Sequence, residues 1–143
     1  MSAEGPQDLA TADIFAGKKV LLFAVPGAFT PGCSITHMPG YVVNADKIKA
    51  AGVDTIACMS VNDVFVMGAW GQAQNAEEIL MLADGMGEFT AALGLELDGS
   101  AFGLGTRSQR FALIAEDGVI KHLNVEPGAG VDVSSAETMM ALL

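Results

Sequence analysis

The sequence is poor in cysteine and in basic residues, and both shortages exclude classes of protein. Its 143 residues include two cysteines, Cys33 and Cys58, too few for a disulfide scaffold and too far apart for a zinc knuckle or a Cys-x-x-Cys pair. Seven basic residues stand against 17 acidic ones; the net charge of −10 disfavours binding to nucleic acid or an anionic membrane. No apolar run is long enough to span a membrane. We therefore expect a cytoplasmic protein in a reducing compartment, without a metal or organic cofactor.

Apolar residues, by contrast, are abundant. They make up 51% of the chain, which is more than a monomer of this size needs to build its core, so we expect a homodimer. The length is that of one ordinary domain. We assign residues 1–143 to this domain and expect residues 1–13 to form an irregular lead.

Short apolar runs recur along the chain and predict strands. Five runs fit buried strands: residues 18–25, 53–61, 79–83, 110–115 and 119–125. The last two runs are separated by a turn that contains Asp117 and Gly118, and an Asp-Gly turn between two such runs is a strong signal for a β-hairpin.

Helical spacing fills the intervals after the first two strands. It covers residues 30–51, with an interruption at Pro39-Gly40, and residues 62–75. A last helix is expected to begin at Ser134 or Ser135. Parallel strands joined by helices and followed by an antiparallel hairpin predict a mixed α/β sheet with helices on both faces, which is the thioredoxin-like fold.

The first strand leads directly into residues 26–33, which read PGAFTPGC. Thr30 suits a helix cap and Pro31 the first helical position, so Cys33 falls at the third position of the predicted helix. Unpaired backbone amides and the positive end of the helix dipole surround a thiol at that position. Both favour the thiolate over the thiol, so the sequence predicts a nucleophilic cysteine.

Four segments of the chain together resemble the peroxiredoxins, most closely the peroxiredoxin-5 or type II subfamily. They are VPGAFTPGCSITHMPGY, SVND at 60–63, RSQRFALI at 107–114 and DGVIKHLNVEP at 117–127. The resemblance extends from about residue 14 to the end of the chain. It implies a thioredoxin-like fold and a thiol-dependent peroxidase that reduces hydrogen peroxide and alkyl hydroperoxides.

The resemblance also implies roles for four residues. Cys33 is the peroxidatic cysteine, and Thr30 binds the peroxide and the sulfur through its hydroxyl. Pro26 shields the site, and Arg110 completes it. The chemistry needs these residue types, because breaking an O–O bond requires an anionic sulfur, donors for two oxygens and stabilisation of the departing charge.

A rough magnitude indicates which of these effects must dominate. An ordinary thiol is already ~3% ionised at pH 7, so full ionisation raises its rate by at most ~30-fold, or about 2 kcal/mol. Most of the acceleration must therefore come from Arg110, Thr30 and backbone amides, which bond oxygens whose charge grows in the transition state.

Each of these residues also has a simpler structural interpretation. Cys33 would then be a small buried apolar residue, although the first turn of a helix is a poor place for an inert thiol. Thr30 would cap the helix, a role that is compatible with catalysis. Pro26 would merely end a strand, so its catalytic role rests on the resemblance.

The chain has two arginines, for which surface salt bridges are the simpler interpretation. We favour Arg110 as the catalytic one because it directly precedes Phe111, the family position, and take Arg107 as a supporting or surface residue. His37 lies four residues after Cys33 and is a candidate general base, but a structural hydrogen bond near the site is favoured.

The second cysteine lies within an apolar run, so we predict that Cys58 is a buried structural thiol. Relatives that resolve internally have a cysteine past the NVEP segment, where this chain has Val133. We therefore expect a one-cysteine mechanism in which glutathione with glutaredoxin, or thioredoxin, reduces the sulfenic acid. The alternative is a peroxide-sensing module whose oxidised cysteine signals to a partner.

Overall fold

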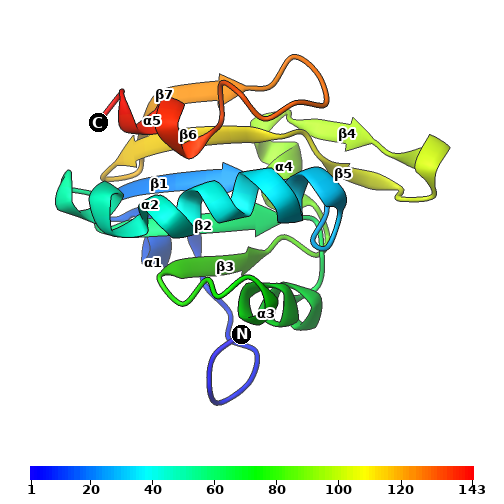
Figure 1. The fold of residues 1–143 in the computed structure, drawn as a ribbon. Helices are drawn as coiled ribbons and strands as arrows, with labels where there is room; N and C mark the ends of the chain where they lie inside the picture. The colour runs from blue at the N-terminus through cyan, green and yellow to red at the C-terminus, as the bar shows by residue number, and fades with distance from the viewer.

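A mixed sheet forms the centre of the computed structural model, which describes residues 1–143 (Figure 1). Its strand order is β3-β2-β1-β6-β7. The strands are β1 (Lys19–Ala24), β2 (Thr55–Ser60), β3 (Ile79–Ala83), β6 (Phe111–Glu116) and β7 (Val119–Val125). β1, β2 and β3 are parallel, whereas β6 is antiparallel to both β1 and β7. The α/β sheet expected from the sequence is thereby confirmed.

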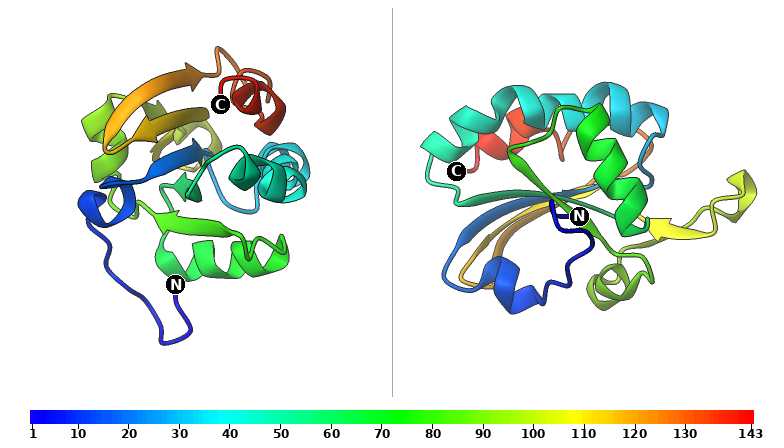
Figure 2. Two further views of the ribbon diagram at one scale, coloured as in Figure 1. Left: turned by 90° about the vertical axis from the view of Figure 1, so that its left-hand side faces the viewer. Right: turned by 90° about the horizontal axis from the view of Figure 1, so that it is seen from below.

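Helices cover both faces of the sheet, as Figure 2 shows. They are α1 (Thr11–Phe15), α2 (Met38–Ala50), α3 (Val64–Ala73), α4 (Glu88–Leu93) and α5 (Ala136–Met140). Residues of α2, α3 and α5 pack on one face, and residues of α1 and α4 pack on the other. No helix combines the length and the apolar character that crossing a membrane would take.

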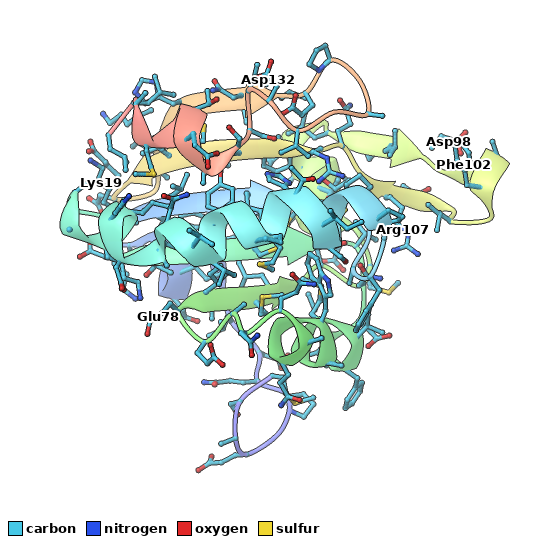
Figure 3. The ribbon with its side chains drawn as sticks, in the orientation of Figure 1. Lys19, Glu78, Asp98, Phe102, Arg107 and Asp132 are labelled. Atoms are coloured by element: carbon cyan, nitrogen blue, oxygen red, sulfur yellow. The ribbon has the colours of Figure 1, made fainter.

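A small two-stranded arm projects from the body of the protein (Figures 2 and 3). It consists of β4 (Glu96–Asp98), a short 3₁₀ turn (Ser100–Phe102) and β5 (Thr106–Ser108). Phe102 near its tip is 84% exposed. The sequence patterns assigned no structure to this region or to α4, because both elements are short and bury little apolar surface.

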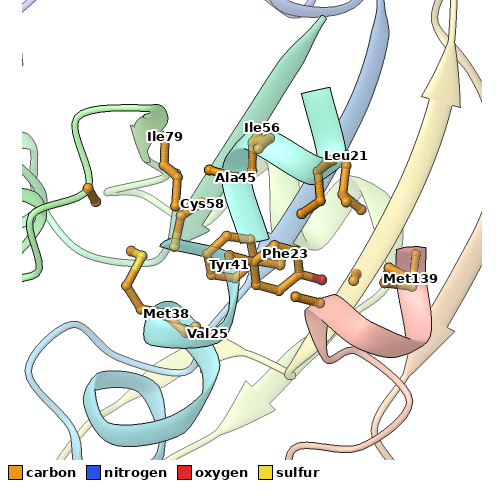
Figure 4. Packing of buried hydrophobic residues seen from close by; sticks show 14 of the residues in the cluster. Leu21, Phe23, Val25, Met38, Tyr41, Ala45, Ile56, Cys58, Ile79 and Met139 are labelled. Carbon is orange, nitrogen blue, oxygen red and sulfur yellow. The ribbon is translucent and has the colours of Figure 1, made fainter. Parts of the chain in front are cut away.

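The core lies against both sides of β1, whose side chains alternate between the two faces. Leu21 and Phe23 belong to the cluster under α2, whereas Leu22 belongs to the cluster under α1 and α4. The rings of Phe23 and Tyr41 stack with centroids 3.9 Å apart (Figure 4). This stack joins the central strand to the helix that follows the candidate site.

Two local expectations were wrong at the level of helix boundaries. Helix α2 runs through Pro39 and Gly40 without an interruption, and a π-helical turn, η1 (Cys33–His37), precedes it. In this turn the N–H of Met38 donates to the carbonyl oxygen of Cys33, five residues earlier. The wider turn and the position of Pro39 near the start of α2 make its missing N–H harmless. Helix α1 also begins at Thr11, inside the expected irregular lead.

The Asp-Gly hairpin was predicted correctly. Asp117 and Gly118 have φ angles of 49° and 77°, the left-handed conformation that a two-residue type I′ turn requires at both positions. The last helix, α5, begins after Ser135, one of the two serines predicted to start it. The Ser135 side chain caps the helix by accepting from the N–H of Thr138.

Replacement of Phe23 by alanine tests the importance of the ring stack for stability. Because the side chain is fully buried, we expect Phe23→Ala to lower the free energy of unfolding by about 3–5 kcal/mol in urea denaturation. Val43 on α2 is 79% exposed and serves as the control. Val43→Ala should change the free energy of unfolding by no more than about 0.5 kcal/mol. Equal losses in both variants would contradict this assignment of the core.

Candidate active site

The fold brings Cys33, Thr30 and Arg110 together at the carboxyl end of β1. Cys33 is fully buried in the first turn after Pro31, and the Thr30 hydroxyl lies 2.9 Å from its sulfur. Arg110 lies 77 positions further along the chain, and its Nη2 donates to the same sulfur at 3.2 Å. The β1–β6 pairing explains this approach, because Ala24 stands opposite Phe111 in register and Arg110 directly precedes Phe111.

Thr30 directly precedes the first helical residue, as predicted, but its hydroxyl accepts from no backbone N–H and so does not cap the helix. Its carbonyl oxygen accepts from the N–H of Ser34, which begins the helical hydrogen bonds. Its hydroxyl lies 2.6 Å from the carbonyl oxygen of Gly27 and also contacts Cys33 Sγ. A hydroxyl has one proton to donate, so the carbonyl oxygen and the sulfur compete for it.

Arg110 is 8% exposed and makes no salt bridge, so the surface ion pair considered for it is wrong. Its Nη1 donates to Nδ1 of His37 at 2.8 Å, while Nη2 faces Cys33. The planar guanidinium therefore places two adjacent donors on two different side chains. Its positive charge lies beside the sulfur without a carboxylate partner.

Arg107 is also not a salt-bridging surface residue. Its Nε donates to the carbonyl oxygen of Leu104 at 2.9 Å, and its Nη1 donates to that of Val61 at 3.0 Å. The bond to Val61 holds the base of the arm, where Arg107 lies (Figure 3), to the loop after β2. Arg107 thus supports the structure around the site, whereas Arg110 contacts the sulfur.

His37 is almost fully buried and is fixed in one tautomer. Arginine only donates, so Nδ1 must accept from Arg110, and Nε2 therefore carries the proton and donates to the carbonyl oxygen of Ser134 at 3.0 Å. Burial lowers the pKa of His37 to about 4, and the charge of Arg110 acts in the same direction. Because both nitrogens are engaged elsewhere, the geometry favours the structural hydrogen-bonding role over the general base.

Two further residues shape the site, although the sequence patterns placed neither among the site residues. A Cβ on Gly32 would lie 3.3 Å from Nη2 of Arg110, so this glycine lets the guanidinium approach the start of the helix. Asn62 accepts from the N–H of Ala28 at 3.0 Å and from the Ser60 hydroxyl at 2.6 Å, which holds the loop before Cys33. The only sequence signal for them was their position: Gly32 lies in the PGAFTPGC segment and Asn62 in the SVND segment.

The remaining sequence-predicted residues take no direct part in these contacts. Cys58 is fully buried in β2, and its pKa is raised first by burial and then by the nearby Cys33. The prediction of a buried thiol is therefore confirmed. Pro26 is half-buried and lies two residues after the end of β1, and no contact between it and the sulfur is seen, so its shielding role stays a prediction.

Comparison with known proteins agrees with this geometry. A family model described as Redoxin matches residues 1–140. The chain belongs to the redoxin family. It is 52% identical over 92% of its length to peroxiredoxin-2E, chloroplastic, of Arabidopsis thaliana, and it spans 58% of the length of that relative.

Solved structures of peroxiredoxins also resemble this redoxin. Reduced Prx3 from Vibrio vulnificus in complex with hydrogen peroxide has 64% identity and a TM-score of 0.89, covering 92% of this chain and 85% of that one. Peroxiredoxin 5 from Alvinella pompejana has 43% identity and a TM-score of 0.82, covering 90% and 80% respectively. The resemblance to type II and peroxiredoxin-5 proteins and the thioredoxin-like fold are thereby confirmed.

The lowered pKa of His37 makes stability depend on pH in a defined direction. An unfolded histidine has a pKa of ~6.5, so between that value and about 4 the unfolded state binds more protons than the folded state. The free energy of unfolding should therefore fall as the pH falls below ~6.5, by about 1.4 kcal/mol per pH unit from this group.

Urea denaturation between pH 7 and pH 5 checks this expectation. The His37→Gln variant should lose the His37 contribution to the slope, because glutamine does not titrate. His122 is exposed on β7, so His122→Gln should keep the wild-type slope. An unchanged slope in His37→Gln would show that another group is responsible.

Proposed function

We propose that this redoxin is a thiol peroxidase that reduces hydrogen peroxide and alkyl hydroperoxides through a sulfenic acid on Cys33. The observation that carries the proposal is the convergence of two donors on one buried sulfur, at 2.9 Å from Thr30 and 3.2 Å from Arg110. A permanent cation and a hydroxyl beside the sulfur are placed to bond peroxide oxygens whose negative charge grows as the O–O bond breaks. The hydrogen peroxide complex of the Vibrio vulnificus relative supports hydrogen peroxide as one substrate.

In the proposed reaction the Cys33 thiolate attacks one oxygen of the peroxide. The S–O bond forms as the O–O bond breaks, the sulfur is oxidised to a sulfenic acid, and the departing oxygen takes a proton from solvent to leave as water or an alcohol. Arg110 and Thr30 already point at the reacting sulfur. The backbone N–H of Cys33 donates to no other protein group, so it is available to a peroxide oxygen as well.

An external thiol is the proposed reductant in a one-cysteine cycle. It condenses with the sulfenic acid to give a mixed disulfide and water, and a second thiol then releases Cys33 as the external disulfide forms. The depth of Cys58 in the core and the presence of Val133 past the NVEP segment support this cycle. Glutathione with glutaredoxin, or thioredoxin, are the candidate donors.

Substitution of the two arginines tests the catalytic assignment. A lysine at position 110 cannot place paired donors on sulfur and His37, so Arg110→Lys should lower the rate constant for peroxide by about 10²–10³, the usual cost of losing a transition-state donor. Arg107→Lys should lower it by less than about tenfold, because Arg107 bonds only carbonyl oxygens.

Stopped-flow measurement of peroxide consumption by the reduced protein gives both rate constants, with Cys33→Ser as the inactive reference. Equal losses in the two arginine variants would contradict the assignment. Turnover with dithiothreitol, glutathione plus glutaredoxin, and thioredoxin then identifies the donor. Fast oxidation without recycling by any of them would favour the peroxide-sensing alternative.

The same protein is proposed to form a homodimer. The support for pairing is the apolar content of 51%, together with large exposed side chains such as Phe102, which is 84% exposed on the projecting arm. We expect Phe102→Glu to shift the protein toward monomer in sedimentation velocity, whereas Val43→Glu on α2 leaves the dimer intact. A wild-type monomer at every concentration would refute the proposal.

A cytoplasmic location remains part of the proposal. Recycling by glutathione or thioredoxin needs a reducing compartment, and both cysteines are free thiols in the structure. Cell fractionation with an antibody against the protein would test it.

A further inference from the structure

Arg110 is held at both ends by one closed circuit of hydrogen bonds. The Arg110 side chain donates to Nδ1 of His37, and Nε2 of His37 donates to the carbonyl oxygen of Ser134. The N–H of Ser134 donates in turn to the carboxylate of Glu126. The circuit closes because the N–H of Glu126 donates to the carbonyl oxygen of Arg110 at 2.9 Å. Three further residues therefore connect the backbone of Arg110 to the tip of its own side chain.

Glu126 is the anchor of this circuit. One carboxylate oxygen, Oε2, accepts from the N–H of Asp132 at 2.8 Å, from the N–H of Ser134 at 2.8 Å and from the Ser134 hydroxyl at 2.6 Å. Although burial opposes ionisation, these bonds lower the pKa of Glu126 below its usual value. The charged carboxylate thus fixes the loop that leads from β7 to α5.

Ser134 connects this loop to η1 and α2, the helical segment that follows Cys33. Its carbonyl oxygen accepts both from Nε2 of His37 at 3.0 Å and from the hydroxyl of Tyr41 at 2.7 Å. Tyr41 is itself stacked on Phe23 of the central strand. The imidazole of His37 therefore cannot rotate without breaking a buried hydrogen bond.

The choice of partners preserves the charge of the guanidinium. A carboxylate in direct contact with Arg110 would neutralise its charge where the sulfur and the peroxide need it. A neutral imidazole orients the guanidinium and leaves its charge available. The one carboxylate in the circuit, Glu126, is separated from the guanidinium by Ser134 and His37 and is satisfied by N–H and O–H donors.

We propose that His37, Ser134 and Glu126 are positioning residues that hold the guanidinium of Arg110 against the sulfur of Cys33. The proposal rests on the peroxidase function and deepens it. These residues act through Arg110 and touch neither the sulfur nor the peroxide. Their loss should therefore impair the reaction that needs an oriented guanidinium more than a reaction of the same sulfur that does not.

Two substitutions of His37 separate its two hydrogen bonds. Asparagine carries an acceptor oxygen at the position of Nδ1, so His37→Asn keeps the contact to Arg110 and loses the one to Ser134. Glutamine reaches the position of Nε2, so His37→Gln keeps the contact to Ser134 and loses the one to Arg110. Ser134 retains the hydroxyl of Tyr41 as a partner in either variant.

The measurement compares two rate constants for Cys33 in each variant: its reaction with hydrogen peroxide and its alkylation by iodoacetamide, which needs no donor for a peroxide oxygen. We expect the ratio of the two to fall at least tenfold in His37→Gln and severalfold in Glu126→Gln. It should also fall severalfold in His37→Asn, less than in His37→Gln, because that variant keeps the contact to Arg110 but loses the link to Ser134. The exposed residues His122 and Glu137 provide the matched controls, and His122→Gln and Glu137→Gln should keep the wild-type ratio.

Melting temperatures measured in parallel identify a merely structural role. If His37→Gln lowers the melting temperature while the ratio stays at the wild-type value, the positioning role is refuted. A ratio in His37→Asn as low as in His37→Gln would also refute it, because the acceptor at Nδ1 would then be irrelevant. Failure of the proposed peroxidase function would give a distinct result. The wild-type protein itself would then react with peroxide no faster than an ordinary thiol.

Discussion

The contact between the guanidinium of Arg110 and the sulfur of Cys33 is the interaction on which the candidate site depends. It joins two ends of neighbouring strands, because the antiparallel pairing of β6 with β1 sets Phe111 opposite Ala24. A shift of one residue in that register would turn the side chain of Arg110 to the other face of the sheet. The apolar core on both sides of β1 therefore fixes the chemistry as well as the fold.

Burial strengthens the electrostatic interaction between Arg110 and the sulfur, but it also removes the guanidinium from water, which costs free energy. A cation without a carboxylate partner is expensive inside a protein, and Arg110 reduces that cost through hydrogen bonds to Cys33 and His37. No carboxylate neutralises this charge at the place where the proposed reaction develops negative charge. In such a site, orientation contributes more than ionisation of the thiol, since ionisation alone is worth about 2 kcal/mol.

Elements with strong local patterns were predictable from the sequence. β3 and β7 match their predicted apolar runs, and the Asp117-Gly118 turn follows from the left-handed conformation that both residues tolerate. The arm and α4 were not predictable, because short exposed elements have no periodic apolar face. The π-helical turn was missed for another reason: Pro39 indicated a break, but the choice between a kink and a wider turn depends on packing against the sheet.

The sequence by itself determined the ingredients of the site: a thiol at the start of a helix, a threonine directly before that helix and an arginine before a late strand, all set by local backbone chemistry. The resemblance favoured Arg110 over Arg107, but only the tertiary structure gives the physical reason: the two lie three residues apart, and strand register places only Arg110 against the sulfur. The tertiary structure also decided that His37 is neutral and accepts from Arg110, and that Ser134 connects it to Glu126. Such a circuit links residues 89 positions apart, and no local pattern records contacts across that separation.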